Sequence, residues 1–148
     1  MCNPTSKFIT PSSCYTIGGV ELWWDINIKV MPSVKSNKPD IVLWRKKEKE
    51  CCIIDVCIPL DINVTSNEKV KRDKYVQLAG GLKRLYNEYN FKVIPVVIGA
   101  TGYVPKTLTG YLREIGFSST VIPRLIQLLQ KKAILGSVKV IKTAMKLK

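Results

Sequence analysis

The order of the elements that the sequence predicts indicates an α/β domain with a mixed central sheet. Three strand-like segments come first, and a long helix, a fourth strand and further helices follow them. The fourth strand, from Phe91 to Ile98, is almost continuously apolar, as strands covered on both faces are. Strands and helices in this order are typical of layered α/β folds. With 148 residues, the chain is long enough to form one such domain.

The first predicted strand spans Glu21 to Val30, where polar and apolar residues alternate. This alternation has the period of a half-buried strand. Its phase places Asp25 on one face and Trp24 on the other, together with Ile26, Ile28 and Val30. Residues 1–20 show no periodicity, and we expect them to form a loose lead-in.

The next two strands are predicted to form a hairpin around the charged segment 45–50. Asp40 lies in the apolar run before this segment, and Asp55 lies in the apolar run after it. Asp40 is seven residues before Lys47, and Asp55 is seven residues after Glu48. A hairpin that closes on Lys47-Glu48 therefore places the two carboxylates opposite each other, with Cβ atoms roughly 5 Å apart.

Two opposed carboxylates in apolar strands need a positively charged partner. Desolvating an ionised carboxylate is costly, and two adjacent negative charges repel each other. A divalent cation between Asp40 and Asp55 would remove both problems, and oxygen ligands suit Mg²⁺ or Mn²⁺. Asp25 is a candidate third acid. The alternative interpretation of Asp40, which follows Pro39, is a structural residue at the start of a strand.

The long helix is predicted to run from Thr65 to about Tyr89. Thr65 and Glu68 have the spacing of a capping box, in which Thr65 is the N-cap. Gly80-Gly81 is expected to weaken the helix. Its apolar stripe consists of Leu78, Leu82, Leu85 and Tyr89.

Two lysines continue this stripe toward the start of the helix, where apolar residues should face the sheet. Helical spacing from Leu78 leads back to Lys74 and Lys71. Both lysines are therefore candidates to contact the carboxylates and to neutralise charge in a reaction. The alternative is that their stems lie along apolar surface while their ammonium groups remain in water.

Two further helices are predicted after the fourth strand. The first spans Pro105 to Ile115, and the second, longer and basic, spans Thr120 to about Met145. We expect residues 21–116 to form the core of the domain and residues 117–148 to form a basic helical extension that packs on it.

The net charge of +13, from 24 basic and 11 acidic residues, favours a polyanionic partner. Nucleic acid and an anionic membrane surface are the two candidates. The longest apolar stretch, Val93 to Ala100, is too short to span a bilayer, and we expect neither membrane insertion nor secretion. Solvated surface positions are the alternative for the candidate nucleic-acid-binding residues Lys38, Arg72, Lys131, Lys132, Lys139 and Lys142.

The absence of histidine excludes histidine-dependent nucleases, Ser-His hydrolases and histidine-ligated zinc. The five cysteines contain no C-x-x-C pair, so a zinc knuckle is not expected. Cys51, Cys52 and Cys57 are interpreted as small apolar residues of a buried strand.

Several short motifs together resemble one nuclease family. Lys38-Pro39-Asp40, followed after fourteen residues by Asp55, is similar to the signature of the PD-(D/E)xK nucleases, although Cys57 takes the place of the usual lysine. The chain more closely resembles the restriction-like endonuclease domain at the C-terminus of non-LTR retrotransposon polyproteins. In that family the lysine lies on the following helix in a K-x-x-K-Y pattern, which Lys71-Arg72-Asp73-Lys74-Tyr75 matches. The blocks 22–25, 94–99 and 128–136 are also similar to that family, and the resemblance covers roughly residues 20 to 148.

The resemblance implies a restriction-endonuclease-like fold and a metal-dependent endonuclease. Such an enzyme nicks target DNA, and the new 3′-hydroxyl primes reverse transcription of the element's RNA. The implied partners are DNA, the element's RNA and a larger reverse transcriptase polyprotein. The implied location is the nucleus, and otherwise the cytoplasm.

Two other functional classes stay open. One is a catalytically decayed module that still binds nucleic acid. The other is a basic structural protein of membrane surfaces or ribonucleoproteins, which leaves the carboxylate pair unexplained.

Overall fold

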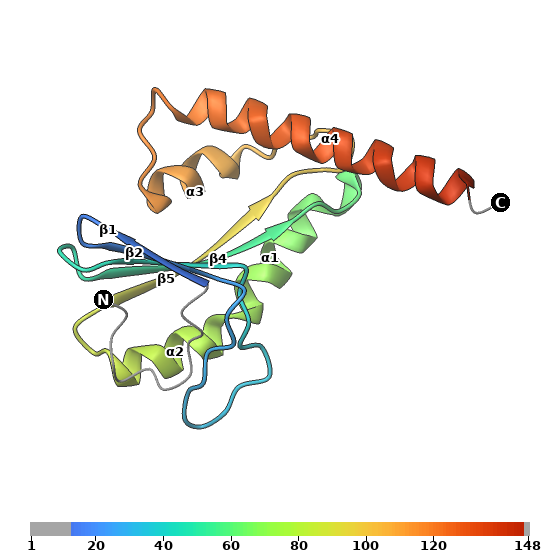
Figure 1. Cartoon of the computed structure of the whole chain (residues 1–148). Coiled ribbons are helices and arrows are strands. Elements are labelled where there is room, and N and C mark those ends of the chain that lie inside the picture. Colours follow the sequence, from blue (N-terminus) through green and yellow to red (C-terminus); the bar gives the residue numbers. More distant parts are fainter. Residues whose placement is uncertain (1–12, 147–148) are drawn as a thin grey trace. The chain divides into compact units, whose positions relative to one another are not determined.

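A five-stranded sheet is the main element of the computed structural model, which describes residues 13–146 (Figure 1). Neighbouring strands follow the order of the chain, with β1 at one edge and β5 at the other. The first four strands are antiparallel to one another in sequence: β1 with β2, β2 with β3, and β3 with β4. The strands are β1 (Cys14–Ile17), β2 (Val20–Trp24), β3 (Ile41–Arg45), β4 (Glu50–Cys57) and β5 (Asn90–Val97).

The last strand, β5, runs parallel to β4 and makes the sheet mixed. The amide of Asn90 donates to the carbonyl of Lys49 at 2.7 Å, and the amide of Ile98 donates to the carbonyl of Cys57 at 3.1 Å. Both strands therefore advance in the same direction, and such a pair requires a crossover connection. The predicted mixed α/β class is confirmed. The helical elements are a 3₁₀ turn (Asp61–Asn63), α1 (Val64–Lys74), α2 (Val76–Leu85), α3 (Thr107–Ile115) and α4 (Ile122–Lys146).

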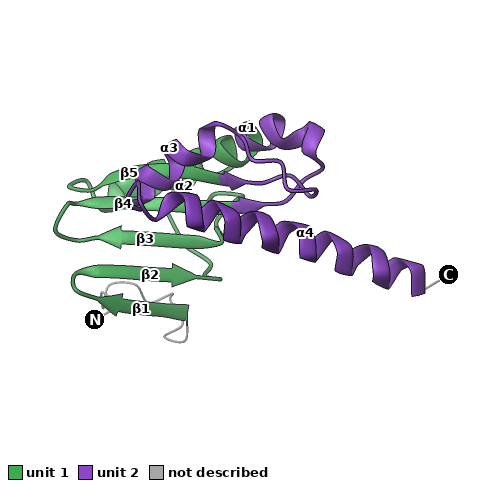
Figure 2. Cartoon of the chain, turned by 90° about the horizontal axis from the view of Figure 1, so that it is seen from above, with its two compact units in different colours: residues 1–55, 70–95 green, residues 56–69, 96–148 purple. Residues whose placement is uncertain are grey.

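Contacts divide the described chain into two compact units (Figure 2). The first unit contains the described residues up to Asp55 together with Val70–Pro95. The second contains Val56–Lys69 and the described residues from Val96 onward. The helices α3 and α4 therefore belong to the same unit, whereas the sequence predicts a boundary between residues 116 and 117.

Strand β1 lies in the segment that was expected to be a loose lead-in. Gly18 and Gly19 have φ values of 56° and 85°, so they form the tight turn that pairs β1 with β2. Two consecutive residues with positive φ match the twist of a hairpin, and glycine adopts them without strain. The prediction was wrong for residues 14–17, and residues 1–12 lie outside the described part of the chain.

The burial phase of β2 is opposite to the prediction. Trp23 is buried, whereas Trp24 is 40 % exposed. Asp25 ends the strand with a left-handed backbone, at φ 53°, which aspartate tolerates better than most residues. This residue shifts the phase of the chain, so the buried positions after it are Ile26, Ile28 and Val30.

The predicted single helix is divided at Tyr75, which has φ −108° and ψ 7°. Helix α1 begins at Val64, so Thr65 lies inside the helix and is not its N-cap. Glu68 does not complete the predicted capping box and instead accepts a hydrogen bond from the hydroxyl of Thr107. Helix α2 ends at Leu85, four residues before the predicted end. The weak point is therefore Tyr75 and not Gly80-Gly81.

The core of the first unit joins the sheet to α2. Leu78 and Leu82 on α2 belong to one buried cluster with Val42 and Ile53 of the sheet. Trp44 is at the centre of an aromatic group, at 5.1 Å from Trp23 and 5.2–5.7 Å from the rings of Tyr86, Tyr89 and Phe91. Edge-to-face pairs of this kind add stability beyond their buried area.

The two adjacent glycines of α2 provide a matched test of this packing. A Cβ atom at Gly81 would lie 2.8 Å from the side chain of Val30, whereas a Cβ atom at Gly80 meets nothing within 4 Å. We expect Gly81→Ala to lower the free energy of unfolding by about 1–3 kcal/mol through overpacking. Gly80→Ala should raise it by up to about 1 kcal/mol, because alanine favours a helix. Urea denaturation of both variants measures the difference, and equal effects would contradict the packing of α2 on residue 30.

In the second unit, α4 packs on the loop that follows β5. The side-chain amide nitrogen (Nε2) of Gln130 donates to the backbone carbonyl of Gly102 at 2.6 Å, and the hydroxyl of Ser137 donates to the backbone carbonyl of Ala100 at 2.7 Å. Ala133 is buried on the same side of the helix. No helix among the described residues is both long and apolar enough to cross a bilayer.

Candidate active site

The hairpin of β3 and β4 has the predicted register. Arg45 pairs with Glu50 at the turn, and Ile41 pairs with Ile54 at the other end of β3. Asp40 is the residue before β3, one position beyond the last pair, and continuation of the register sets it opposite Asp55. Directly opposed residues of antiparallel strands lie on the same face of the sheet.

A third acid continues this row onto β2. Trp24 pairs with Ile41, so Asp25 follows in register with Asp40, and the Asp25 amide lies 3.4 Å from the Asp40 carbonyl oxygen. The carboxylate of Asp25 is 72 % exposed and forms an ion pair with Lys38 at 2.5 Å. Asp25 is the candidate third acid from the sequence. In the structure, its backbone lies beside the backbone of Asp40.

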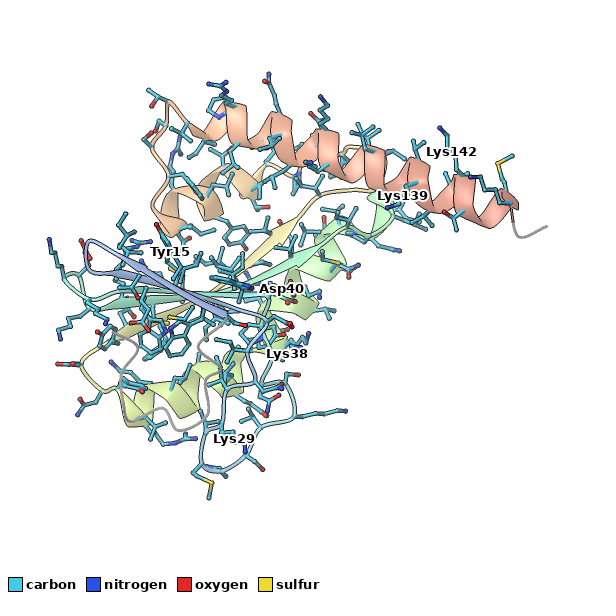
Figure 3. The ribbon with its side chains drawn as sticks, viewed as in Figure 1. Tyr15, Lys29, Lys38, Asp40, Lys139 and Lys142 are labelled. Carbon is cyan, nitrogen blue, oxygen red and sulfur yellow. The ribbon has the colours of Figure 1, made fainter. Side chains whose placement is uncertain are left out.

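A pocket of about 180 Å³ lies in the first unit where β2 ends and β3 begins. Both Asp25 and Asp40 line it, together with Trp24, Lys38 and Pro39. Figure 3 labels Lys38 and Asp40, which lie close together where β3 begins. The pocket therefore presents two carboxylates and one ammonium group to solvent.

Asp55 is the buried member of the row, with 2 % of its surface exposed. Its Oδ2 atom lies 2.7 Å from Nζ of Lys71 and 3.9 Å from Nζ of Lys74. The 2.7 Å contact is a close ion pair that compensates the charge of the buried carboxylate. Both predicted lysines are thus brought to one carboxylate.

The position of these lysines follows from the end of α1. Lys71 and Lys74 lie in the last turn of that helix, where positive charge is favoured by the helix dipole. Lys74 also lies over the ring of Tyr75, with Nζ 4.7 Å from its centroid. Of the two, Lys71 is the more buried, with 21 % of its side chain exposed against 38 % for Lys74.

Tyr75 links the two acidic segments. Its hydroxyl donates to the carbonyl of Lys38 at 2.8 Å and lies 3.5 Å from Oδ1 of Asp55. Burial raises the pKa of Tyr75, a hydrogen bond with Lys74 opposes this, and the charges of Asp55 and Asp40 raise the pKa further. The charges of both carboxylates therefore raise the pKa of the same hydroxyl. This hydroxyl stays protonated at neutral pH and remains a hydrogen-bond donor.

The structural role of Tyr75 was missed in the sequence, which indicated only a core aromatic. A tyrosine that is fully buried at a break between two helices holds its hydroxyl in a fixed place. The one signal in the sequence was its position directly after Lys74.

The donor set at Asp40 and Asp55 fits a hard divalent cation. No group of three or more acidic or cysteine side chains that could hold a metal occurs within residues 13–146. Mg²⁺, however, commonly binds through one or two carboxylates and keeps several waters. The carboxylate oxygens of Asp40 and Asp55 are donors of this kind, and Lys71 compensates the charge of Asp55 in the structure.

The remaining predicted residues lie elsewhere on the described chain. Arg72 is exposed on α1, and Cys57 donates its thiol hydrogen to Oδ1 of Asn67. Four of the predicted nucleic-acid-binding lysines are exposed on α4, namely Lys131, Lys132, Lys139 and Lys142.

No protein-family model matches the chain, and no curated protein matches it. The functional argument therefore depends on the geometry of the site and on the distribution of charge.

Proposed function

We propose that the chain is a divalent-metal-dependent endodeoxyribonuclease of the restriction-like type. The proposal is supported by the hairpin register, which sets Asp40 opposite Asp55 when it is continued by one residue beyond Ile41, and by Lys71 at the buried carboxylate of Asp55. Two acids and a lysine in one place are the groups that metal-assisted phosphodiester hydrolysis requires.

Each residue has a separate role in this proposal. Asp40 and Asp55 hold the cation, which when bound activates a water molecule and offsets charge on the scissile phosphate. Lys71 compensates the charge of Asp55 when the cation is absent. Lys74, the more exposed lysine, is placed to neutralise the charge that develops on the phosphate.

The finer parts of the proposal come from the family resemblance. They are a restriction-endonuclease-like fold, the nicking of target DNA to prime reverse transcription, and an origin in a larger reverse transcriptase polyprotein. On this proposal the element's RNA is a further partner, and the nucleus is the place of action.

A second candidate function is an inactive nuclease that retains its DNA-binding surface. Two observations favour it: Cys57 occupies the usual lysine position, and Lys71 already pairs with Asp55. In that case the lysine replaces the cation permanently, and the chain binds DNA without cutting it.

Nicking of supercoiled plasmid DNA decides between the two candidates. With purified full-length chain, we expect open-circular product in Mg²⁺ or Mn²⁺ and none in EDTA, since the acids need the cation to act. DNA binding without any metal-dependent product, at concentrations that saturate the plasmid, would contradict the nuclease and support the inactive module. Calorimetric titration with Mn²⁺ gives an independent reading, because the inactive module should bind no stoichiometric cation.

A further inference from the structure

The C-terminal part of the chain has a strongly unbalanced charge. No aspartate or glutamate follows Glu114, whereas α4 carries one arginine and five lysines. The positive charge of this region therefore has no compensating acidic side chain within its own segment.

These six cations lie on one side of α4. At 100° per residue they fall within a sector of about 100°, and they extend along roughly 33 Å of the helix. All of them are exposed. We call this set the basic face: Arg124, Lys131, Lys132, Lys139, Lys142 and Lys146. Figure 3 labels two of its members, Lys139 and Lys142, on α4.

The direction of the basic face is fixed by the packing of the opposite side. Gln130 and Ser137 bond to backbone carbonyls of the loop after β5, and Ala133 is buried between them along the helix. At helical spacing these three residues fall within a sector that faces away from the basic face. The cations are therefore held outward by the fold of the second unit itself.

Ion pairs distinguish the basic face from the basic residues of the first unit. Among residues 13–146, none of its six members has an acidic partner within ion-pair distance. Several basic residues of the first unit, by contrast, are paired, as in Lys46 with Glu21 and Lys92 with Glu50. Six cations in a row along one helix are therefore available to an external anion.

The chemistry of α4 favours the backbone of double-stranded DNA over single strands. Proteins that hold unpaired nucleotides stack the bases on aromatic side chains. The helix contains no aromatic residue between Ile122 and Lys146. A row of cations without stacking groups fits regularly spaced phosphates, which duplex DNA presents at one charge per about 1.7 Å of its axis.

The exposed apolar stripe of α4 is shorter than its row of cations, which begins at Arg124. A helix that lies in a bilayer interface presents one continuous apolar face. Four exposed apolar residues of α4, Ile134, Val138, Ile141 and Met145, form a stripe beside the cations, but this stripe is confined to the second half of the helix. The first half of the opposite side is occupied by contacts with the loop that follows β5.

From these observations we infer that the basic face of α4 binds the phosphate backbone of duplex DNA. The surface supplies affinity that does not depend on base sequence, because phosphate contacts position a protein without reading bases. The inference concerns binding alone and holds for an active or an inactive nuclease. Its connection to cleavage rests on the proposed function.

A quadruple variant tests the inference in the full-length chain. Lys131, Lys132, Lys139 and Lys142 are changed to glutamine, and binding of a labelled duplex is followed by anisotropy in EDTA over a range of salt. We expect affinity to fall at least about tenfold and the salt slope to decrease by about 3.6, because each lysine that no longer neutralises a phosphate reduces the slope by about 0.9. Circular dichroism checks that the variant keeps its helix.

A matched control removes the same charge from other surfaces. Lys35, Lys47, Lys69 and Lys106 are exposed, and among the described residues they have no acidic partner. Their change to glutamine should leave most of the affinity in place. An equal reduction of affinity in both variants would mean that net charge, not the basic face, determines binding, and would overturn the inference.

Two further ligands complete the experiment. Single-stranded DNA of the same length and vesicles that contain phosphatidylserine are tested with the same two variants. A larger reduction of affinity for either ligand than for the duplex, in the α4 variant, would overturn the choice of duplex DNA. The assay contains no divalent metal, so its outcome does not depend on whether the chain cleaves DNA.

Discussion

Replacement of Asp55 by asparagine is expected to abolish metal-dependent cleavage and to leave DNA binding intact. The substitution keeps the shape of the side chain but removes the negative charge that would hold the cation. Metal ions provide several kcal/mol of charge stabilisation in such reactions, and each 1.36 kcal/mol is about a tenfold change in rate. We therefore expect the nicking rate to fall at least about 100-fold.

Matched substitutions of Asp40 and Glu48 separate the loss of a catalytic carboxylate from a general change in net charge. Asp40→Asn should reduce the rate by the same order, because Asp40 is opposite Asp55 in the register. Glu48→Gln changes the charge equally at an exposed turn and should leave the rate unchanged. Cleavage at the rate of the unmodified chain in Asp55→Asn would refute the assignment of this carboxylate as a metal ligand.

The hairpin register could be predicted because two independent signals agreed. The charged segment around Lys47-Glu48 fixed the turn, and the apolar runs fixed the strands on each side. A shift by one residue would have reversed the buried face, so few alternatives existed. The positions of Asp40 and Asp55 followed from this register alone.

The helix after β4 could be predicted in existence but not in its details. Gly80-Gly81 suggested a weak point, yet the close approach of Val30 to Gly81 explains why a glycine is suitable there. The break occurs at Tyr75, where a long-range hydrogen bond to the carbonyl of Lys38 holds the ring. A contact between residues so far apart in the sequence leaves no local pattern.

The backbone conformation of Asp25 could not be predicted from the alternation of polar and apolar residues. Alternation placed it on the face opposite Ile26, but a left-handed backbone at Asp25 itself reset the phase of the chain. Aspartate is enriched among residues with positive φ, but such residues are uncommon, so the presence of an aspartate did not predict the turn. The lack of acidic partners for the α4 lysines within residues 13–146 could likewise not be predicted from the sequence. It depends on where the acidic side chains lie in the fold.

Tyr75 is expected to be the residue of the site whose truncation most affects stability. Its side chain is fully buried, and it joins the core cluster of the first unit. Tyr75→Ala should lower the free energy of unfolding by about 3–5 kcal/mol, as for other buried aromatic rings. Tyr75→Phe keeps the ring but leaves the Lys38 carbonyl without its donor, and it should cost about 1–2 kcal/mol. Urea denaturation measures both values.

The pH dependence of stability provides a second reading of the Tyr75 hydroxyl. Burial, with the charges of Asp55 and Asp40, raises its pKa in the folded state above the ordinary value of 10. The protonated hydroxyl therefore contributes stability that is complete below pH 10 and is lost as the pH rises through the folded pKa. Tyr75→Phe should lack this part of the alkaline destabilisation, whereas Tyr103→Phe, at an exposed tyrosine, should retain it. Identical alkaline profiles for the unmodified chain and Tyr75→Phe would contradict a hydroxyl that is held by Lys38 and flanked by the two carboxylates.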